Sequence, residues 1–217
     1  MFKQMKFIVL DVETTGFPVK LGWDKYYPPD HLKMYDPARV VSIAWAIVDS
    51  DTESQLVAKY YVIKAGDFKI DDKSVATSIH GITHAISARG TTMKVVLEDL
   101  YADIQDCELF VAHNANFDLS VMQSEAYRHG HALLSCMVHL NTGKEYTGVL
   151  NEIPFYCTMQ YGKYITRIPY KGMWKYPKLV ELYKYLYGES FDSHNALADV
   201  IAASKCYILM RKRKIIL

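Results

Sequence analysis

Apolar residues fall into short continuous runs along the chain, and polar residues follow each run. Residues 6–10 (KFIVL) are typical of a buried central strand that ends at Asp11. Residues 39–49 and 55–64 are β-rich runs separated by a polar turn, which predicts a hairpin. Residues 109–112 (LFVA) predict another buried strand, again followed by polar residues.

From residue 91 the apolar positions follow a helical period, and four of them share one face: Met93, Val96, Leu97 and Leu100. Three further segments are predicted to be helical: 116–128, 178–187 and 197–211. Strands followed by alternating helices and strands indicate an α/β fold with a mixed central sheet. Because ligands of such sheets bind at strand ends, we expect the function to reside in the polar residues there.

The connection formed by residues 17–38 is long, and it contains several aromatic and proline residues: Trp23, Tyr26, Tyr27, Pro28, Pro29 and Tyr35. A connection of this length without regular structure is often a lid or a binding loop. A loop that only covers the edge of the sheet is the alternative.

Composition limits the class of protein. With 217 residues, 50% of them hydrophobic and 23% charged, we expect one domain over residues 1–217. We find no signal peptide and no apolar run of about 20 residues, so we expect a cytoplasmic protein without a membrane partner, of cellular or viral origin. The four cysteines (Cys107, Cys136, Cys157 and Cys206) form no C-x-x-C pair, which argues against a zinc site.

A formal net charge of +1 argues against a protein that coats long nucleic acids, because such binding neutralises many phosphates. Residues 161–188 differ from the rest, since six cations face only Glu181: Lys163, Arg167, Lys171, Lys175, Lys178 and Lys184. Eight aromatic residues are interleaved with them: Tyr161, Tyr164, Tyr170, Trp174, Tyr176, Tyr183, Tyr185 and Tyr187. This mixture suits a single strand of nucleic acid. The alternative is that half of the aromatics fill the core.

Acidic residues occur at three places where a site can form. Asp11 and Glu13 follow the first strand, and alternate residues of an extended chain point the same way, so both carboxylates project from one side. Two acids at the end of a buried strand need a cation or hydrogen bonds. A solvated surface pair is the alternative.

The second place is residues 113–118 (HNANFD), after the LFVA strand. The alternative there is that Asn116 or Asp118 is a helix cap or an acid in the first turn of a helix, which helix starts favour.

The third place is residues 194–199 (HNALAD). Five residues of regular helix would turn His194 and Asp199 to different faces, so they converge only if His194 lies in a loop, with Asp192 or Ser193 near the helix cap. A loop histidine bonded to backbone is the alternative for His194.

The segments FIVLDVETTGF, VAHNANFD and HNALADV, in this order and spacing, resemble the three motifs of the DnaQ-like exonucleases of the DEDDh type. Residues 78–85 (SIHGITHA) and 176–188 (YPKLVELYKYLYG) also look like family segments between the motifs. The step from His194 to Asp199 resembles the histidine subtype rather than the tyrosine subtype. This resemblance implies an RNase H-like α/β fold, with a mixed five-stranded central sheet flanked by helices.

Matched by motif, the resemblance implies that four carboxylates bind two divalent ions, Mg²⁺ or Mn²⁺: Asp11, Glu13, Asp118 and Asp199. We expect Asp11 to bridge the ions. Two such ions can activate a water and stabilise the leaving oxygen in phosphodiester hydrolysis, and carboxylate oxygens suit them. His194 would be the general base, because a neutral imidazole, with an unperturbed pKa of about 6.5, can take the proton of the water. All five residues are therefore expected to be catalytic.

The resemblance also implies residues that bind the substrate: the backbone of Thr14, Thr15 and Gly16 beside the terminal sugar, His80 and Ile82 on the last bases, and Asn114 and Phe117 in support of the second motif. Glycine at position 16 would permit a close approach. For Ile82 and Phe117, core packing is the alternative.

We therefore expect a 3′→5′ exonuclease that releases nucleoside 5′-monophosphates from single-stranded DNA or frayed 3′ ends. RNA is an alternative substrate, because the motifs do not fix the contacts near the 2′ position of the sugar. A proofreading or binding subunit that works with a polymerase partner is the other alternative.

Overall fold

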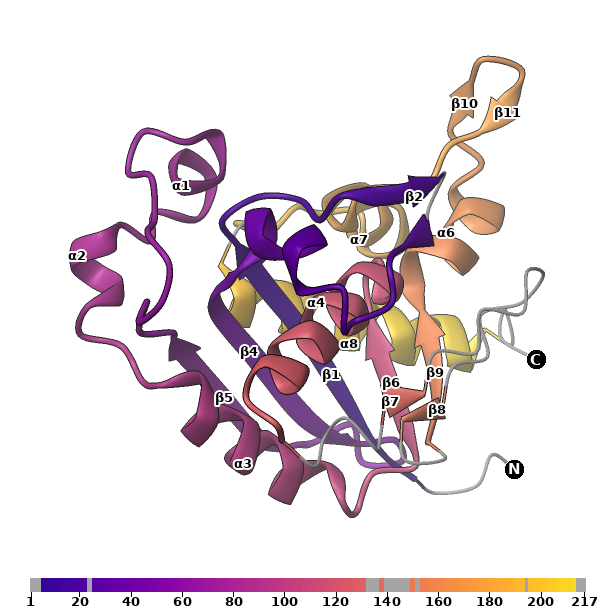
Figure 1. The fold of residues 1–217 in the computed structure, drawn as a ribbon. Helices are drawn as coiled ribbons and strands as arrows, with labels where there is room; N and C mark the ends of the chain where they lie inside the picture. The colour runs from indigo at the N-terminus through magenta and orange to yellow at the C-terminus, as the bar shows by residue number, and fades with distance from the viewer. Residues whose placement is uncertain are drawn as a thin grey trace.

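The computed structural model describes residues 5–22, 25–131, 137–138, 149–150, 153–193 and 195–213. Its centre is a mixed sheet (Figure 1), whose strands lie side by side in the order β5 (Gln55–Val62), β4 (Val40–Asp49), β1 (Lys6–Thr14), β6 (Leu109–Ala112), β9 (Ile153–Cys157), β8 (Val149–Leu150) and β7 (Met137–Val138). The helices are α1 (Val75–His80), α2 (His84–Ser87), α3 (Met93–Ile104), α4 (Ala115–Arg128), α6 (Thr158–Thr166), α7 (Leu179–Tyr187) and α8 (Ala196–Lys212).

The first five strands in this order form the expected mixed five-stranded sheet. β1 pairs antiparallel with β4 and parallel with β6, β4 and β5 form the predicted hairpin, and β6 pairs parallel with β9. Two short strands, β8 and β7, extend the β9 edge by antiparallel pairing. The predicted helices are present as α3, α4, α7 and α8, with boundaries within a few residues of those expected.

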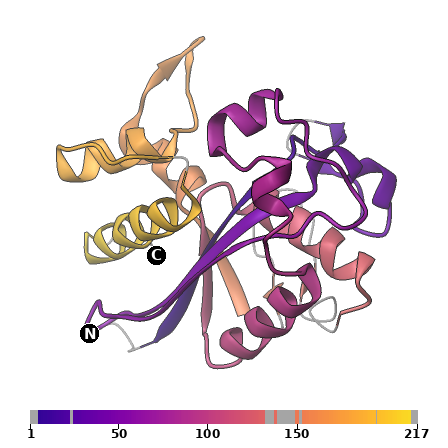
Figure 2. The same ribbon diagram turned by 90° about the vertical axis from the view of Figure 1, so that its left-hand side faces the viewer.

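Helices cover both faces of the sheet, as Figure 2 shows with α7 and α8 on one side and α3 and α4 on the other. Each side has its own hydrophobic core, and β1 contributes to both. Phe7 and Val9 pack in the core with α7 and α8, whereas Ile8, Leu10 and Val12 pack in the core with α3 and α4. This is the alternation expected of a strand buried on both faces.

β1 does not end at Asp11 as the apolar run predicted. It continues to Thr14, because its antiparallel pairing with β4 includes Glu13 opposite Ser42 and, after an irregularity, Thr14 opposite Val40. Pairing with β6 covers only Phe7 to Val9. The acidic part of β1 is therefore held in the sheet on its β4 side alone.

The connection of residues 17–38 has more regular structure than expected. It contains a small hairpin, β2 (Lys20–Gly22) with β3 (Lys25–Tyr26), and two 3₁₀ turns, Leu32–Met34 and Asp36–Ala38. Arg128, at the end of α4, donates to the Leu32 carbonyl at 2.8 Å and to the Asp36 carboxylate at 2.5 Å. The connection is thus attached to the body of the fold beside α4.

Among the described residues no helix is both long enough and apolar enough to cross a membrane. Cys107, Cys157 and Cys206 are free and buried, and Cys136 lies outside the described residues.

Gly90 should be essential for the packing of the chain between α2 and α3. A Cβ atom at this position would lie 2.4 Å from the Val62 carbonyl oxygen, at the end of β5. Because backbone atoms cannot move aside cheaply, we expect Gly90→Ala to lower the free energy of unfolding by about 1–3 kcal/mol.

Gly66→Ala is the matched control, since nothing lies within 4 Å of a Cβ atom there. Denaturant titration of both variants measures the difference, and equal stabilities would contradict this account of Gly90.

Candidate active site

The alternation along β1 directs Asp11 and Glu13 toward α8, on the face that Phe7 and Val9 begin. Asp199 lies in the first turn of α8. One carboxylate oxygen from each of the three side chains lies within 4.8 Å of the other two. Two segments far apart in the sequence therefore bring three acids to one point at the end of the sheet.

The start of α8 is fixed by Asn195. Its side chain accepts hydrogen bonds from the amides of Leu197 and Ala198, at 3.0 and 3.4 Å. The N-cap of α8 is therefore Asn195, and Asp192 and Ser193 lie near it in the sequence, as expected. His194 directly precedes this cap and lies outside the described residues.

Asp118 approaches the same point from the opposite layer. It is buried in the first turn of α4, and its Oδ1 accepts a hydrogen bond of 3.2 Å from the backbone amide of Val12. The carboxylate thus bonds to β1, between Asp11 and Glu13. Neither Asn116 nor Asp118 is the N-cap of α4, which is Asn114, but Asp118 is the acid of the first turn that the alternative also allowed.

The carboxylates act on one another electrostatically. Burial raises the pKa of Asp11 well above its usual range, and the charges of Asp118, Asp199 and Glu13 add to this effect. Burial, followed by the charge of Asp199, raises the pKa of Glu13 to about 7. Burial also raises the pKa of Asp118, although the Val12 amide opposes the rise.

This donor set fits a divalent cation. Burial and like charge make several carboxylates unfavourable together, and a cation relieves both penalties. Carboxylate oxygens are hard ligands that suit Mg²⁺ or Mn²⁺. Asp11, Glu13 and Asp199 could hold such an ion, with Asp118 beside them.

Thr14, Thr15 and Gly16 connect the end of β1 to the connection of residues 17–38. The Thr15 hydroxyl donates to the Pro37 carbonyl at 2.9 Å and accepts from the Arg39 amide at 2.9 Å. A Cβ atom at Gly16 would lie 2.9 Å from the Pro37 carbonyl oxygen. Glycine is therefore required here for backbone packing, whether or not a sugar also approaches.

His80 and Ile82 have different surroundings. The ring of His80 is half-buried, and burial lowers the pKa of the ring. Its Nδ1 accepts a hydrogen bond of 3.0 Å from the Ile82 amide. The ring also interacts with the Thr14 backbone. This contact brings α1 to the end of β1. Ile82 is buried against Val41 and Ile70, as the core-packing alternative describes.

Asn114 and Phe117 lie at the start of α4. Asn114 adopts a left-handed conformation, with φ of 79°, which turns the chain from β6 into the helix. Phe117 packs partly against the core, and its ring contacts those of Phe17 and Tyr26, with centroids 5.8 and 6.4 Å away. Phe17, which the motifs did not single out, is 75% exposed beside this start of α4.

His113 is a second residue whose role the sequence did not reveal. Its Nε2 lies 3.0 Å from the Pro177 carbonyl, and its Nδ1 lies 3.0 Å from the Thr158 hydroxyl. Because a carbonyl can only accept, Nε2 carries the proton and Nδ1 accepts from Thr158. Burial lowers the pKa of His113 to about 4, so the ring stays neutral and joins the end of β6 to α6 and to the chain before α7.

Helices on both faces of a mixed sheet, with acids gathered at its strand ends, define the RNase H-like class of fold, and such acids can hold a divalent ion. Residues 8–207 match the sequence profile of the RNase_T family, described as exonuclease. The chain belongs to this exonuclease family. The DnaQ-like resemblance of its motifs is confirmed.

Relatives and solved structures agree with this assignment. The 3′-5′ exonuclease DinG of Bacillus subtilis (strain 168) is 27% identical over 138 residues, which are 62% of this chain and 12% of DinG. E. coli exonuclease I in complex with a dA16 oligonucleotide has a TM-score of 0.68 at 16% identity, over 97% of this chain and 41% of the other.

The nuclease domain of 3′hExo, a DEDDh family member bound to rAMP, has a TM-score of 0.64 at 12% identity, over 97% of this chain and 93% of that one. These likenesses confirm the expected fold. The chain spans a small part of DinG and less than half of exonuclease I.

Removing divalent ions should make the stability of the fold depend on pH. The pKa of Glu13 is about 7 in the folded state against an ordinary 4.5, so the folded state retains a proton that the unfolded state has lost. Stability in chelator should therefore fall as pH rises from about 4.5 to 7. Mg²⁺ or Mn²⁺ should raise Tm more at pH 8 than at pH 5, because metals bind deprotonated carboxylates.

Thermal melts in chelator and with each ion measure this effect, and Glu13→Gln should flatten the dependence. An equal gain in Tm at both values of pH, or an unchanged slope in the variant, would count against the assignment.

Proposed function

We propose that this chain is a 3′→5′ exonuclease that uses two divalent ions, Mg²⁺ or Mn²⁺, to release nucleoside 5′-monophosphates from single-stranded DNA or frayed 3′ ends. The observation that carries the proposal is the convergence of Asp11, Glu13 and Asp199 within 4.8 Å, with buried Asp118 beside them. Residues 1–217 would form one catalytic domain, since β1 near one end and α8 near the other supply the same site.

The four carboxylates would hold the ions in unequal ways. Asp11 is the residue whose pKa all three of the other acids raise, so we assign it to both ions. Glu13, Asp118 and Asp199 would complete the ligand set. Bound divalent ions supply a hydroxide near neutral pH and neutralise charge on the phosphate.

His194 is assigned as the general base that takes the proton of the attacking water. Its position in the sequence, directly before the Asn195 cap of α8 and five residues before Asp199, supports this role. The backbone of Thr14, Thr15 and Gly16 would lie along the terminal sugar. His80 would lie beside the last bases, because its ring interacts with the backbone of Thr14.

Two further residues at the start of α4, Asn114 and Phe117, are assigned to support the substrate side of the site. The exposed ring of Phe17 against Phe117 offers an apolar surface there for a base. Ile82 would support the contact of His80 from the small core that it forms with Val41 and Ile70.

Release of mononucleotides from matched DNA and RNA oligomers, labelled at the 3′ or the 5′ end, tests the proposal. We expect stepwise loss from the 3′ end with Mg²⁺ or Mn²⁺, none in chelator, and faster loss from DNA. Faster loss from RNA would show that RNA is the preferred substrate, with the proposed hydrolysis unchanged. No release with any metal would favour a subunit that works only with a polymerase partner.

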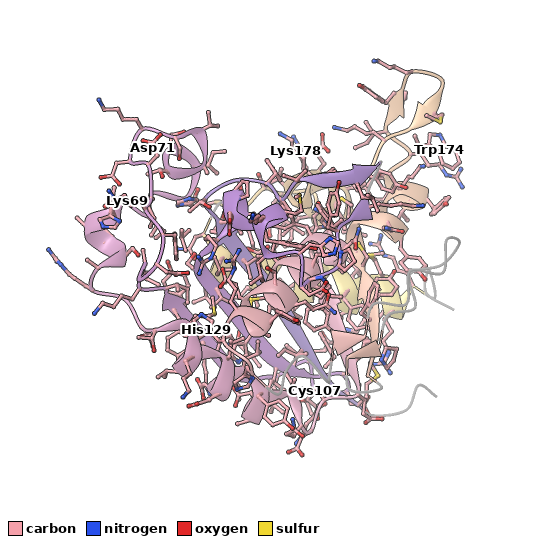
Figure 3. All side chains as sticks on the ribbon, viewed as in Figure 1. Lys69, Asp71, Cys107, His129, Trp174 and Lys178 are labelled. Carbon is pink, nitrogen blue, oxygen red and sulfur yellow. The ribbon has the colours of Figure 1, made fainter. Side chains whose placement is uncertain are left out.

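Asp118→Asn should abolish this release while the protein remains folded. The amide oxygen can still accept the Val12 hydrogen bond, but the charge that binds a cation is lost, so we expect a fall of at least about 10³-fold in kcat. Asp106→Asn is the matched control, because that carboxylate is 83% exposed and next to Cys107 in sequence, which lies at the opposite end of the molecule (Figure 3). Equal activity of the two variants would refute the role of Asp118.

Replacing His194 separates proton transfer from metal binding. His194→Ala should retain the metal-dependent rise in Tm but lose about 10²–10⁴-fold in kcat, the usual contribution of a general base. In the unsubstituted protein, the rate should fall on the acid side as His194 becomes protonated. If His194→Ala keeps its full rate and the same fall of the rate at acidic pH, His194 is not the base.

A further inference from the structure

A small hairpin stands away from the body of the molecule. β10 (Pro169–Tyr170) and β11 (Met173–Trp174) pair antiparallel, and Lys171 and Gly172 form the turn with φ of 46° and 77°. These angles match the primed turn that favours tight hairpins. Figure 1 shows the hairpin projecting beyond the end of α6, and no other strand of the described chain pairs with it.

The side chains of the hairpin are exposed although many of them are apolar. Tyr170, Met173 and Trp174 are 53%, 67% and 41% exposed. An isolated two-stranded ribbon is marginally stable in water, and a grouped apolar surface usually marks an interaction site. Among the eight aromatic residues of segment 161–188 only Tyr183 belongs to the core, so the core-filling alternative fails for the other seven.

Cations lie over these rings. Lys163 lies over Tyr176, Arg167 over Trp174 and Lys171 over Tyr170, with 4.7, 5.1 and 5.4 Å from the charged group to the ring centroid. Residues 158–178 contain five cations and no acid, within a chain whose formal net charge is +1. Of these cations Lys175 is bonded to Glu181, at 2.6 Å. The hairpin and its base are therefore both aromatic and positively charged.

The base of this hairpin is attached to the candidate active site. His113, which directly precedes Asn114, binds Thr158 at the start of α6 and Pro177 just before α7. One buried residue thus fixes both ends of the segment that carries the hairpin. Figure 3 shows Lys178 at the top centre of the molecule and Trp174 at its upper right, and β1, β6 and β9 run toward this upper part in Figure 1.

We propose that this hairpin, residues 167–174, binds the unpaired strand of nucleic acid that leads to the 3′ end in the site. The inference rests on the proposed function and adds a second contact, apart from the carboxylates of the site. Rings supply stacking surfaces for bases of any sequence, and the cations beside them neutralise phosphates. Charge complementarity favours this occupant over a protein surface, because only a nucleic acid offers charges and rings in regular alternation.

The test compares kcat/KM on a dinucleotide and on an oligomer of about 16 nucleotides, which exceeds the reach of the active site alone. We expect Trp174→Ala to lower the ratio of kcat/KM on the oligomer to kcat/KM on the dinucleotide by at least about fivefold, which is the effect of losing one stacked base. Tyr127→Ala, which removes an exposed aromatic from the far end of α4, should leave the ratio unchanged.

A second variant protects the test against loss of the fold. Lys171→Asn creates an Asn-Gly turn, which favours this hairpin geometry while removing a charge. The double variant Arg167→Gln and Lys171→Asn removes two positive charges. It should reduce the slope of log affinity for single-stranded DNA against log salt concentration by about 1.4. The control Lys94→Gln, on α3, should leave this slope unchanged.

The outcomes separate the two claims. If the unsubstituted protein degrades neither substrate, the proposed function fails. If it degrades both and the hairpin variants leave the ratio and the salt slope unchanged, the inference about the hairpin fails. A hairpin variant that loses activity equally on both substrates and melts earlier would make the hairpin a structural element only.

Discussion

The alternation of side chains along β1 fixes the geometry of the site. Phe7 and Val9, on the odd-numbered face of the strand, pack in the core with α7 and α8. Asp11 and Glu13 continue this face, so their side chains point toward α8. The even-numbered face packs on α3 and α4. Because the pairing with β6 ends at Val9, the Val12 amide donates to Asp118 instead of to a strand. A shift of one residue in the pairing with β4 would exchange the two faces and disperse the acids.

This arrangement opposes the stability of the fold locally. Carboxylates that raise one another's pKa gain nothing from proximity, although Asp118 accepts a hydrogen bond from the β1 backbone. Two hydrophobic cores, one on each face of the sheet, hold the elements in place despite this repulsion. Such conflicts between local stability and arrangement are expected where a protein binds a ligand of opposite charge.

Much of this fold follows from apolar periodicity, and its departures have identifiable causes. α3 and the β4–β5 hairpin were predictable because their patterns are long. The end of β1 was not, because Glu13 stays in the sheet through a partner, Ser42, that hydropathy cannot identify. The grouping of the acids came from the resemblance of three motifs, since spacing alone does not say which elements meet. The linking role of His113 was invisible, because Thr158 and Pro177 lie more than forty positions away.

The acids of the site come from opposite ends of the described chain, with Asp11 in the first strand and Asp199 in the last helix. During synthesis on the ribosome, the first strand therefore emerges long before the helix that completes the ligand set. Closing so long a loop is among the slow, late events of folding. A partly synthesised chain would thus carry an incomplete set of acids, so the site would be complete only when translation of this region has finished.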